Sequence, residues 1–136
     1  MNLQLLETKS SQQFETVQVV KSLEQGIPTS AINEIALYLD IPINGLIKYL
    51  HISNSTWHRR KNEGKLDFNL SDKVLQVSKL LEHAENIFGN SEKVRSWFKT
   101  PSIVFEQLLP VELIGSLSGI ILINDELIRI EHGVFI

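Results

Sequence analysis

The stretch "HISNSTWHRRKNEGKL", residues 51–66, holds the side chains of this chain best suited to grip a polyanion. It carries four of the 13 Lys and Arg residues, and Glu63 is its single acid. Arg pairs with phosphate or with guanine, and Lys pairs with phosphate. The opposing interpretation is a solvated basic helix that binds nothing, because most charge runs are solvated faces.

Two short helices are predicted to position these side chains. Residues 43–50 form an apolar helix, and residues 54–63 form a polar one with Ser53 as its N-cap and Gly64 as its stop. Two short helices joined by a tight turn make a helix-turn-helix unit, whose second helix enters the major groove of DNA. His51 stands where such turns usually have Gly, so it requires a positive φ or an altered turn.

Within this unit, Ile52 and Trp57 are expected to anchor the second helix to the core. The remaining polar and basic side chains then face outward, toward bases and phosphates. The residues predicted to contact DNA are Ser53, Asn54, Ser55, Thr56, His58, Arg59, Arg60, Lys61 and Lys65.

Helical spacing of apolar residues dominates the rest of the chain, which predicts an all-α fold. The clearest helix spans residues 71–88, with Ser71 as its cap, and a shorter one follows with Ser91 as its cap. Pro110 opens a further helix. The Ile-rich residues 118–133 fit either a helix or a strand, and we favour a helix.

This pattern predicts two domains that share a long helix. Residues 1–70 would form a helix-turn-helix bundle that binds DNA, and residues 71–136 a small, mainly helical domain that binds a partner. Residues 1–65 carry a net charge of +1 and residues 66–136 a net charge of −4. A polyanion therefore suits only the first half, whereas the acidic second half suits a protein partner.

The composition excludes several classes of function. The chain has 136 residues, of which 43% are hydrophobic and none is Cys, so it is an ordered protein without disulfide or thiolate chemistry. Its four His residues show no metal-ligand spacing, and it has no Gly-rich phosphate loop or nucleophile elbow. We expect no enzyme activity, no cofactor and no metal. A signal peptide and a membrane span are not evident, so a cytoplasmic protein is expected.

A family resemblance rests on segments in a particular order. These are "STWHRRKNEGKL" and "LSDKVLQVSKLL" in the first part, then "FGNSEKVRSWFKTP", "LPVELI" and "IRIEHGVF". Together they resemble antitoxins of the Xre/MbcA/ParS type, which are paired with RES-domain toxins in bacterial type II toxin–antitoxin systems. The resemblance covers roughly residues 28–136.

The resemblance implies a homodimer that binds operator DNA and neutralises a RES-domain toxin, which consumes NAD. The C-terminal segment of such antitoxins covers the entrance to the toxin's active site. The residues implied for this contact are Arg129, Glu131, His132, Gly133, Val134, Phe135 and Ile136. The apolar ending "VFI" suits a plug for a concave pocket, or alternatively a tail folded onto its own core.

The competing interpretation is a stand-alone helix-turn-helix regulator of transcription. Its C-terminal half would then sense a ligand or dimerise. The two interpretations differ in the role of residues 129–136, which only the antitoxin needs for neutralisation.

Overall fold

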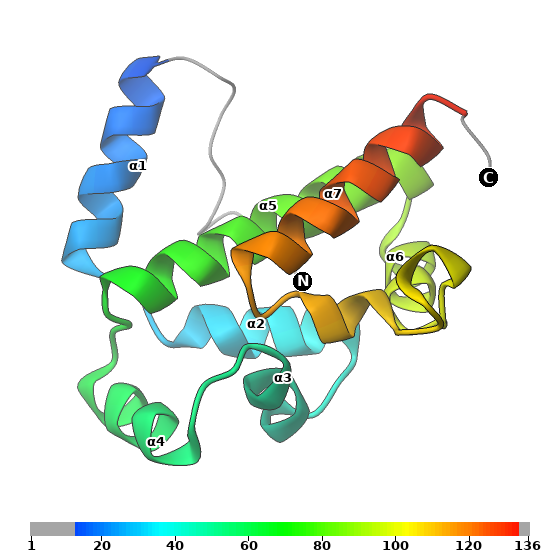
Figure 1. The fold of residues 1–136 in the computed structure, drawn as a ribbon. Helices are drawn as coiled ribbons and strands as arrows, with labels where there is room; N and C mark the ends of the chain where they lie inside the picture. Colours follow the sequence, from blue (N-terminus) through cyan, green and yellow to red (C-terminus); the bar gives the residue numbers. More distant parts are fainter. Residues whose placement is uncertain (1–12, 134–136) are drawn as a thin grey trace.

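The computed structural model describes residues 13–133 of the chain, and it describes side chains from Thr16 onward (Figure 1). Within these residues there is no strand, and only two isolated β-bridges occur. The helices are α1 (Gln13–Gln25), α2 (Ser30–Leu39), α3 (Ile43–Tyr49), α4 (Asn54–Glu63), α5 (Phe68–Phe88), α6 (Ser91–Phe98) and α7 (Leu117–Glu131), with two 3₁₀ helices, η2 (Ile103–Phe105) and η3 (Pro110–Leu113). The predicted all-α class is therefore confirmed.

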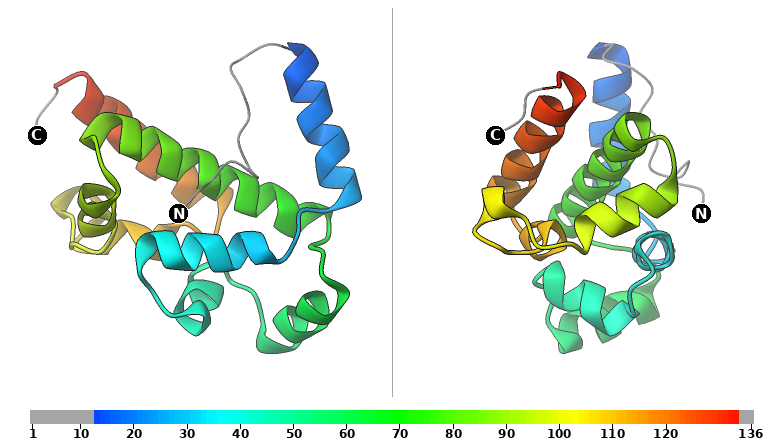
Figure 2. Two further views of the ribbon diagram at one scale, coloured as in Figure 1. Left: turned by 180° about the vertical axis from the view of Figure 1, so that it is seen from behind. Right: turned by 90° about the vertical axis from the view of Figure 1, so that its right-hand side faces the viewer.

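The long helix α5 organises the molecule. It packs along α7 on one side and also contacts α1, α2 and α6 (Figures 1 and 2). Helices α3 and α4 lie at the lower edge of the molecule in Figure 1, and α2 lies between them and α5. Because α5 touches helices of both halves, the two halves share one framework.

A single hydrophobic core joins the halves. Its fully buried side chains include Ile35 of α2, Leu46 of α3, Leu81 of α5, Phe98 of α6 and Ile123 of α7. Residues far apart in sequence thus depend on one another for burial, which is the main source of stability in a domain of this size.

Val17, Val20 and Leu23 recur every three residues along α1, and Gly26 follows the helix with a φ of 92°. Its packing is looser than that spacing suggests. Leu23 is buried, but Val17 and Val20 are 52% and 43% exposed. In Figure 1 the helix projects away from the bundle, so only its C-terminal part can cover the core.

The structure corrects two predicted helix caps. Helix α5 begins one turn earlier than expected, because the side chain of Asp67 accepts a 2.8 Å hydrogen bond from the Leu70 amide. Ser71 is instead buried inside the helix, where its hydroxyl accepts a 2.9 Å hydrogen bond from the Ile27 amide. Asn90 rather than Ser91 caps α6. In each case a residue earlier in the chain, Asp67 four positions before Ser71 and Asn90 one position before Ser91, supplies the capping acceptor.

Residues 117–131 form a helix, as we favoured. Ser116 caps α7 by accepting a 3.1 Å hydrogen bond from the Gly119 amide. Ile120, Ile123 and Leu127 then follow at helical spacing and are buried. The segment that Pro110 opens is shorter than a regular α-helix, because it is a single 3₁₀ turn that ends at Leu113.

Candidate functional site

Helices α3 and α4 and the four residues between them form the predicted helix-turn-helix unit. The turn closes α3 with two backbone hydrogen bonds, from the His51 amide to the Lys48 carbonyl and from the Ile52 amide to the Ile47 carbonyl, both 3.0 Å. This pairing is a Schellman motif, which places one residue in the left-handed region. That residue is His51, with a φ of 58°, so of the two alternatives, a positive φ or an altered turn, the chain adopts the positive φ.

Helix α4 presents its polar residues outward. Trp57 and Ile52 are buried, as predicted, and tie the helix to the core. The Ser53 hydroxyl caps the helix by accepting a 3.1 Å hydrogen bond from the Thr56 amide. Of the nine residues predicted to contact DNA, seven are exposed: Ser53, Asn54, Ser55, His58, Arg59, Lys61 and Lys65.

The other two predicted DNA contacts, Thr56 and Arg60, are partly buried. The guanidinium of Arg60 donates a 2.9 Å hydrogen bond to Glu63 and a 3.0 Å hydrogen bond to Asp67. Asp67 is also the N-cap of α5. Arg60 therefore joins the end of α4 to the start of α5, and its charge is offset within the chain.

The turn of the helix-turn-helix unit packs against residues of the C-terminal half. A Cβ atom built on Gly115 would lie 2.1 Å from Cδ2 of His51 and 2.3 Å from the Tyr49 carbonyl oxygen. Only a glycine permits such a close approach. From the other side, the Lys73 ammonium of α5 donates a 2.9 Å hydrogen bond to the Leu50 carbonyl. Burial lowers the pKa of Lys73.

At the other end of the molecule, the last turn of α7 exposes the residues implied for toxin contact. Arg129, Glu131, His132 and Gly133 are all exposed. Gly133 has a φ of 70° and follows the helix directly. Val134, Phe135 and Ile136 lie outside the described residues, so their predicted contact stays a prediction.

His83 lies on the side of α5 that faces α7. Its imidazole is partly buried between α5 and α7, where Nδ1 lies 2.9 Å from the side-chain oxygen of Asn124. Its Nε2 lies 3.3 Å from a carboxylate oxygen of Glu131. His83 thus orients Glu131 at the end of α7, and only the pairing of the two helices brings these residues together.

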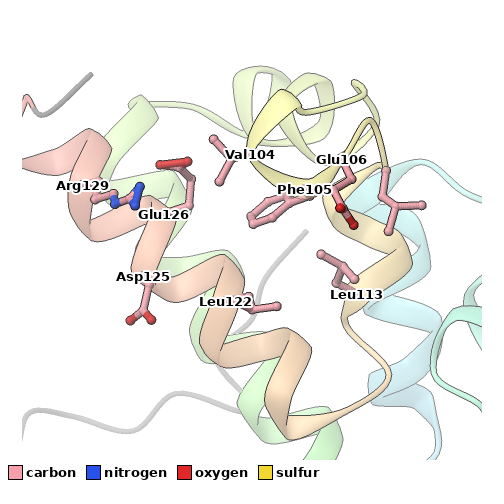
Figure 3. A pocket seen from close by; sticks show the side chains of 9 residues that line it. Val104, Phe105, Glu106, Leu113, Leu122, Asp125, Glu126 and Arg129 are labelled. Atoms are coloured by element: carbon pink, nitrogen blue, oxygen red, sulfur yellow. The ribbon is translucent and has the colours of Figure 1, made fainter. Parts of the chain in front are cut away.

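A groove of about 490 Å³ opens between α7 and the segment 104–113 (Figure 3). Its walls are mostly apolar, and four charged residues line it. The lining residues are Val104, Phe105, Glu106, Leu108, Leu113, Leu122, Asp125, Glu126 and Arg129. Sequence reasoning missed Glu126. The sequence signal that could have identified Glu126 is its position in the apolar pattern of α7, where it lies among the buried residues Ile123 and Leu127.

Within residues 13–133, no group of three or more His, Asp or Glu side chains is arranged to hold a metal ion. No helix in the same part of the chain combines the length and the apolar character that crossing a bilayer requires.

Comparison with known proteins identifies both halves. Residues 18–79 match the family of antitoxin Xre-like helix-turn-helix domains. Residues 83–133 match the antitoxin Xre/MbcA/ParS C-terminal toxin-binding domain. The two matches meet inside α5, the helix that the halves share.

Two curated relatives match along most of their length. A protein named Antitoxin Xre from Yersinia enterocolitica is 27% identical over 119 residues, which cover 86% of this chain and 80% of the relative. Another Antitoxin Xre, from Photorhabdus laumondii, is 23% identical over 114 residues, which cover 82% of this chain and 77% of the relative.

The fold and the matched domains define a helix-turn-helix DNA-binding protein with a toxin-binding domain. Taken together, the two domain matches and the two relatives support an Xre/MbcA/ParS-type antitoxin of a toxin–antitoxin system, the family that the motifs of this chain resemble.

Proposed function

We propose that this antitoxin neutralises a RES-domain toxin that consumes NAD, by covering the toxin's active site with residues 129–136. We further propose that it binds its own operator DNA as a homodimer and so represses its operon. Operator DNA and NAD are both met in the cytoplasm, where the chain would act.

The observation that carries the toxin proposal is an apolar surface on the toxin-binding domain. Large side chains stand exposed on α7 and on the neighbouring segment 103–108: Leu117, Ile121, Leu122, Ile128, Ile103, Val104 and Leu108. Exposed apolar side chains in such number mark a surface that another protein covers. The implied contact residues Arg129, Glu131 and His132 continue this surface at the end of α7.

The DNA proposal is supported by the charge of α4. Arg59 and Lys61 are exposed on this helix, and its one acid, Glu63, is paired with Arg60. The exposed face of the second helix of a helix-turn-helix unit is the face that meets DNA. Its uncompensated cations suit phosphate oxygens, which dominate such interfaces.

Two variants separate the two activities in cells that co-express the proposed partner, a RES-domain toxin. A chain ending after His132 should fail to rescue growth while still repressing a reporter driven by its own promoter. The Arg59→Ala variant should still rescue growth but should fail to repress the reporter.

Rescue by the shortened chain would contradict the proposed role of the C-terminal segment. Absence of any rescue by the full chain would favour a stand-alone regulator of transcription.

A further inference from the structure

The groove between α7 and the segment 104–113 holds a buried acid that has no partner in the described residues. Glu126 is 8% exposed and lines the groove. Within residues 13–133 its carboxylate makes no hydrogen bond, and the ion pairs of this part of the chain do not include it. Its oxygens are not among the fully enclosed, unpaired polar atoms of the described residues, so they open into the groove, where a donor or a cation can reach them.

The other charged side chains of the groove favour a positively charged ligand. Glu106 and Asp125 add two carboxylates, and Arg129 contributes the single positive group. In Figure 3 the Glu126 and Arg129 side chains lie on the same side of α7, but they do not form one of the ion pairs in the described residues. The groove therefore has an excess of negative charge within an apolar wall.

Contacts within the chain fix the apolar wall of the groove without a partner. The ring of Phe105 packs edge-on against Trp97, with centroids 6.4 Å apart. The loop then turns through Glu106 and Gln107, with φ values of 54° and 72°, and the Gln107 amide donates a 2.7 Å hydrogen bond to Ser102. Two adjacent non-glycine residues in the left-handed region are costly, and such strain is retained where the surroundings impose it.

We infer that this groove receives an arginine side chain of the toxin, whose guanidinium pairs with the carboxylate of Glu126. The apolar stem of an arginine suits Val104, Phe105 and Leu122, and its planar head matches a carboxylate with two parallel hydrogen bonds. This inference rests on the proposed function, because the groove lies in the matched toxin-binding domain. It assigns the partner's chemistry at one point of that interface.

The test uses titration calorimetry to compare the full chain with its Glu126→Gln variant in binding to the proposed partner, a purified RES-domain toxin. Loss of the charge should weaken binding by at least roughly thirtyfold, as for other buried charge pairs at interfaces. The unfolding midpoint of the isolated variant should not fall, since no partner is lost within the chain. The control Glu92→Gln removes an exposed acid of the same domain and should change binding by less than about threefold.

Two outcomes would overturn the inference while leaving the proposed function intact. One is wild-type affinity in the Glu126→Gln variant. The other is tighter binding by a Glu126→Leu variant, which would indicate an apolar occupant.

If the full chain does not bind that protein, the proposed function fails. A second probe then tests separately whether the groove binds an arginine side chain. N-acetylarginine amide, titrated into the full chain, should shift the amide resonances of residues 104–108 and 122–129. These shifts should be lost in the Glu126→Gln variant. Equal shifts in both proteins, or none in either, would overturn the inference.

Discussion

The hydroxyl of Tyr38 in α2 donates a 2.6 Å hydrogen bond to a carboxylate oxygen of Glu85 in α5. The Tyr38 carbonyl also accepts a 3.0 Å hydrogen bond from Arg95 of α6. One residue of the DNA-binding half is thus tied to two helices that reach into the toxin-binding half. The halves are joined by specific polar contacts as well as by a shared core.

Replacing Tyr38 with Phe should lower the free energy of unfolding by about 1–2 kcal/mol, because a hydrogen bond to a charged acceptor is lost. Urea unfolding at pH 7 measures this change. The matched control is Tyr49→Phe, because the hydroxyl of Tyr49 makes no hydrogen bond within residues 13–133. Equal stability of the two variants would show that the bond between Tyr38 and Glu85 contributes nothing.

The same residue makes stability depend on pH in the alkaline range. Burial raises the pKa of Tyr38 above its usual value of 10.0, and the hydrogen bond to Glu85 raises it further. Above pH 10 the unfolded chain releases the Tyr38 proton while the folded chain keeps it, so stability should fall as pH rises. The Tyr38→Phe variant should show a shallower fall. A fall of the same steepness in both proteins would count against this assignment.

A methyl group at Gly115 should displace the turn of the helix-turn-helix unit, which packs against this glycine. The Gly115→Ala variant forces a Cβ against the His51 ring and the Tyr49 carbonyl, which should destabilise the chain by about 1–3 kcal/mol and weaken DNA binding. Gly45→Ala in α3 is the control, since nothing lies within 4 Å of its Cβ position. That variant should be neutral or stabilised by up to about 1 kcal/mol. Unfolding experiments measure the change in stability of both variants, and DNA titrations measure the change in their DNA binding.

The two arginines of α4 should behave differently. Arg59→Ala should weaken DNA binding and reduce the slope of log affinity against log salt by about 0.9, the value for one phosphate contact. Arg60→Ala should act mainly on stability, by about 1 kcal/mol, because it breaks the pairs with Glu63 and Asp67. DNA titrations across salt concentrations, with urea unfolding, test both statements. A larger salt effect from Arg60 than from Arg59 would reverse these roles.

Local signals in the sequence predicted most of the helices. Ser53 and Gly64 mark the ends of α4 because capping depends on neighbouring residues only. The cap of α5 was missed because Ser71 resembles a cap in sequence, whereas its hydroxyl is used by Ile27, 44 positions away. Such a contact exists only once the chain has folded.

The same limit applies to the site. The cationic face of α4 was predictable, because it follows from helix periodicity and from one buried Trp. The intramolecular pairing of Arg60, the bridge from His83 to Asn124, and the groove around Glu126 were not. Each depends on how α5 lies against a helix distant in sequence, which no local pattern encodes.

If the C-terminal segment closes the toxin's active site, as we propose, the antitoxin should block NAD hydrolysis. This can be measured with a purified RES-domain toxin that is titrated with the full chain and with a chain ending after His132. We expect the full chain to reduce hydrolysis to background at saturation and the shortened chain to leave most of it. Equal inhibition by both chains would contradict the claim.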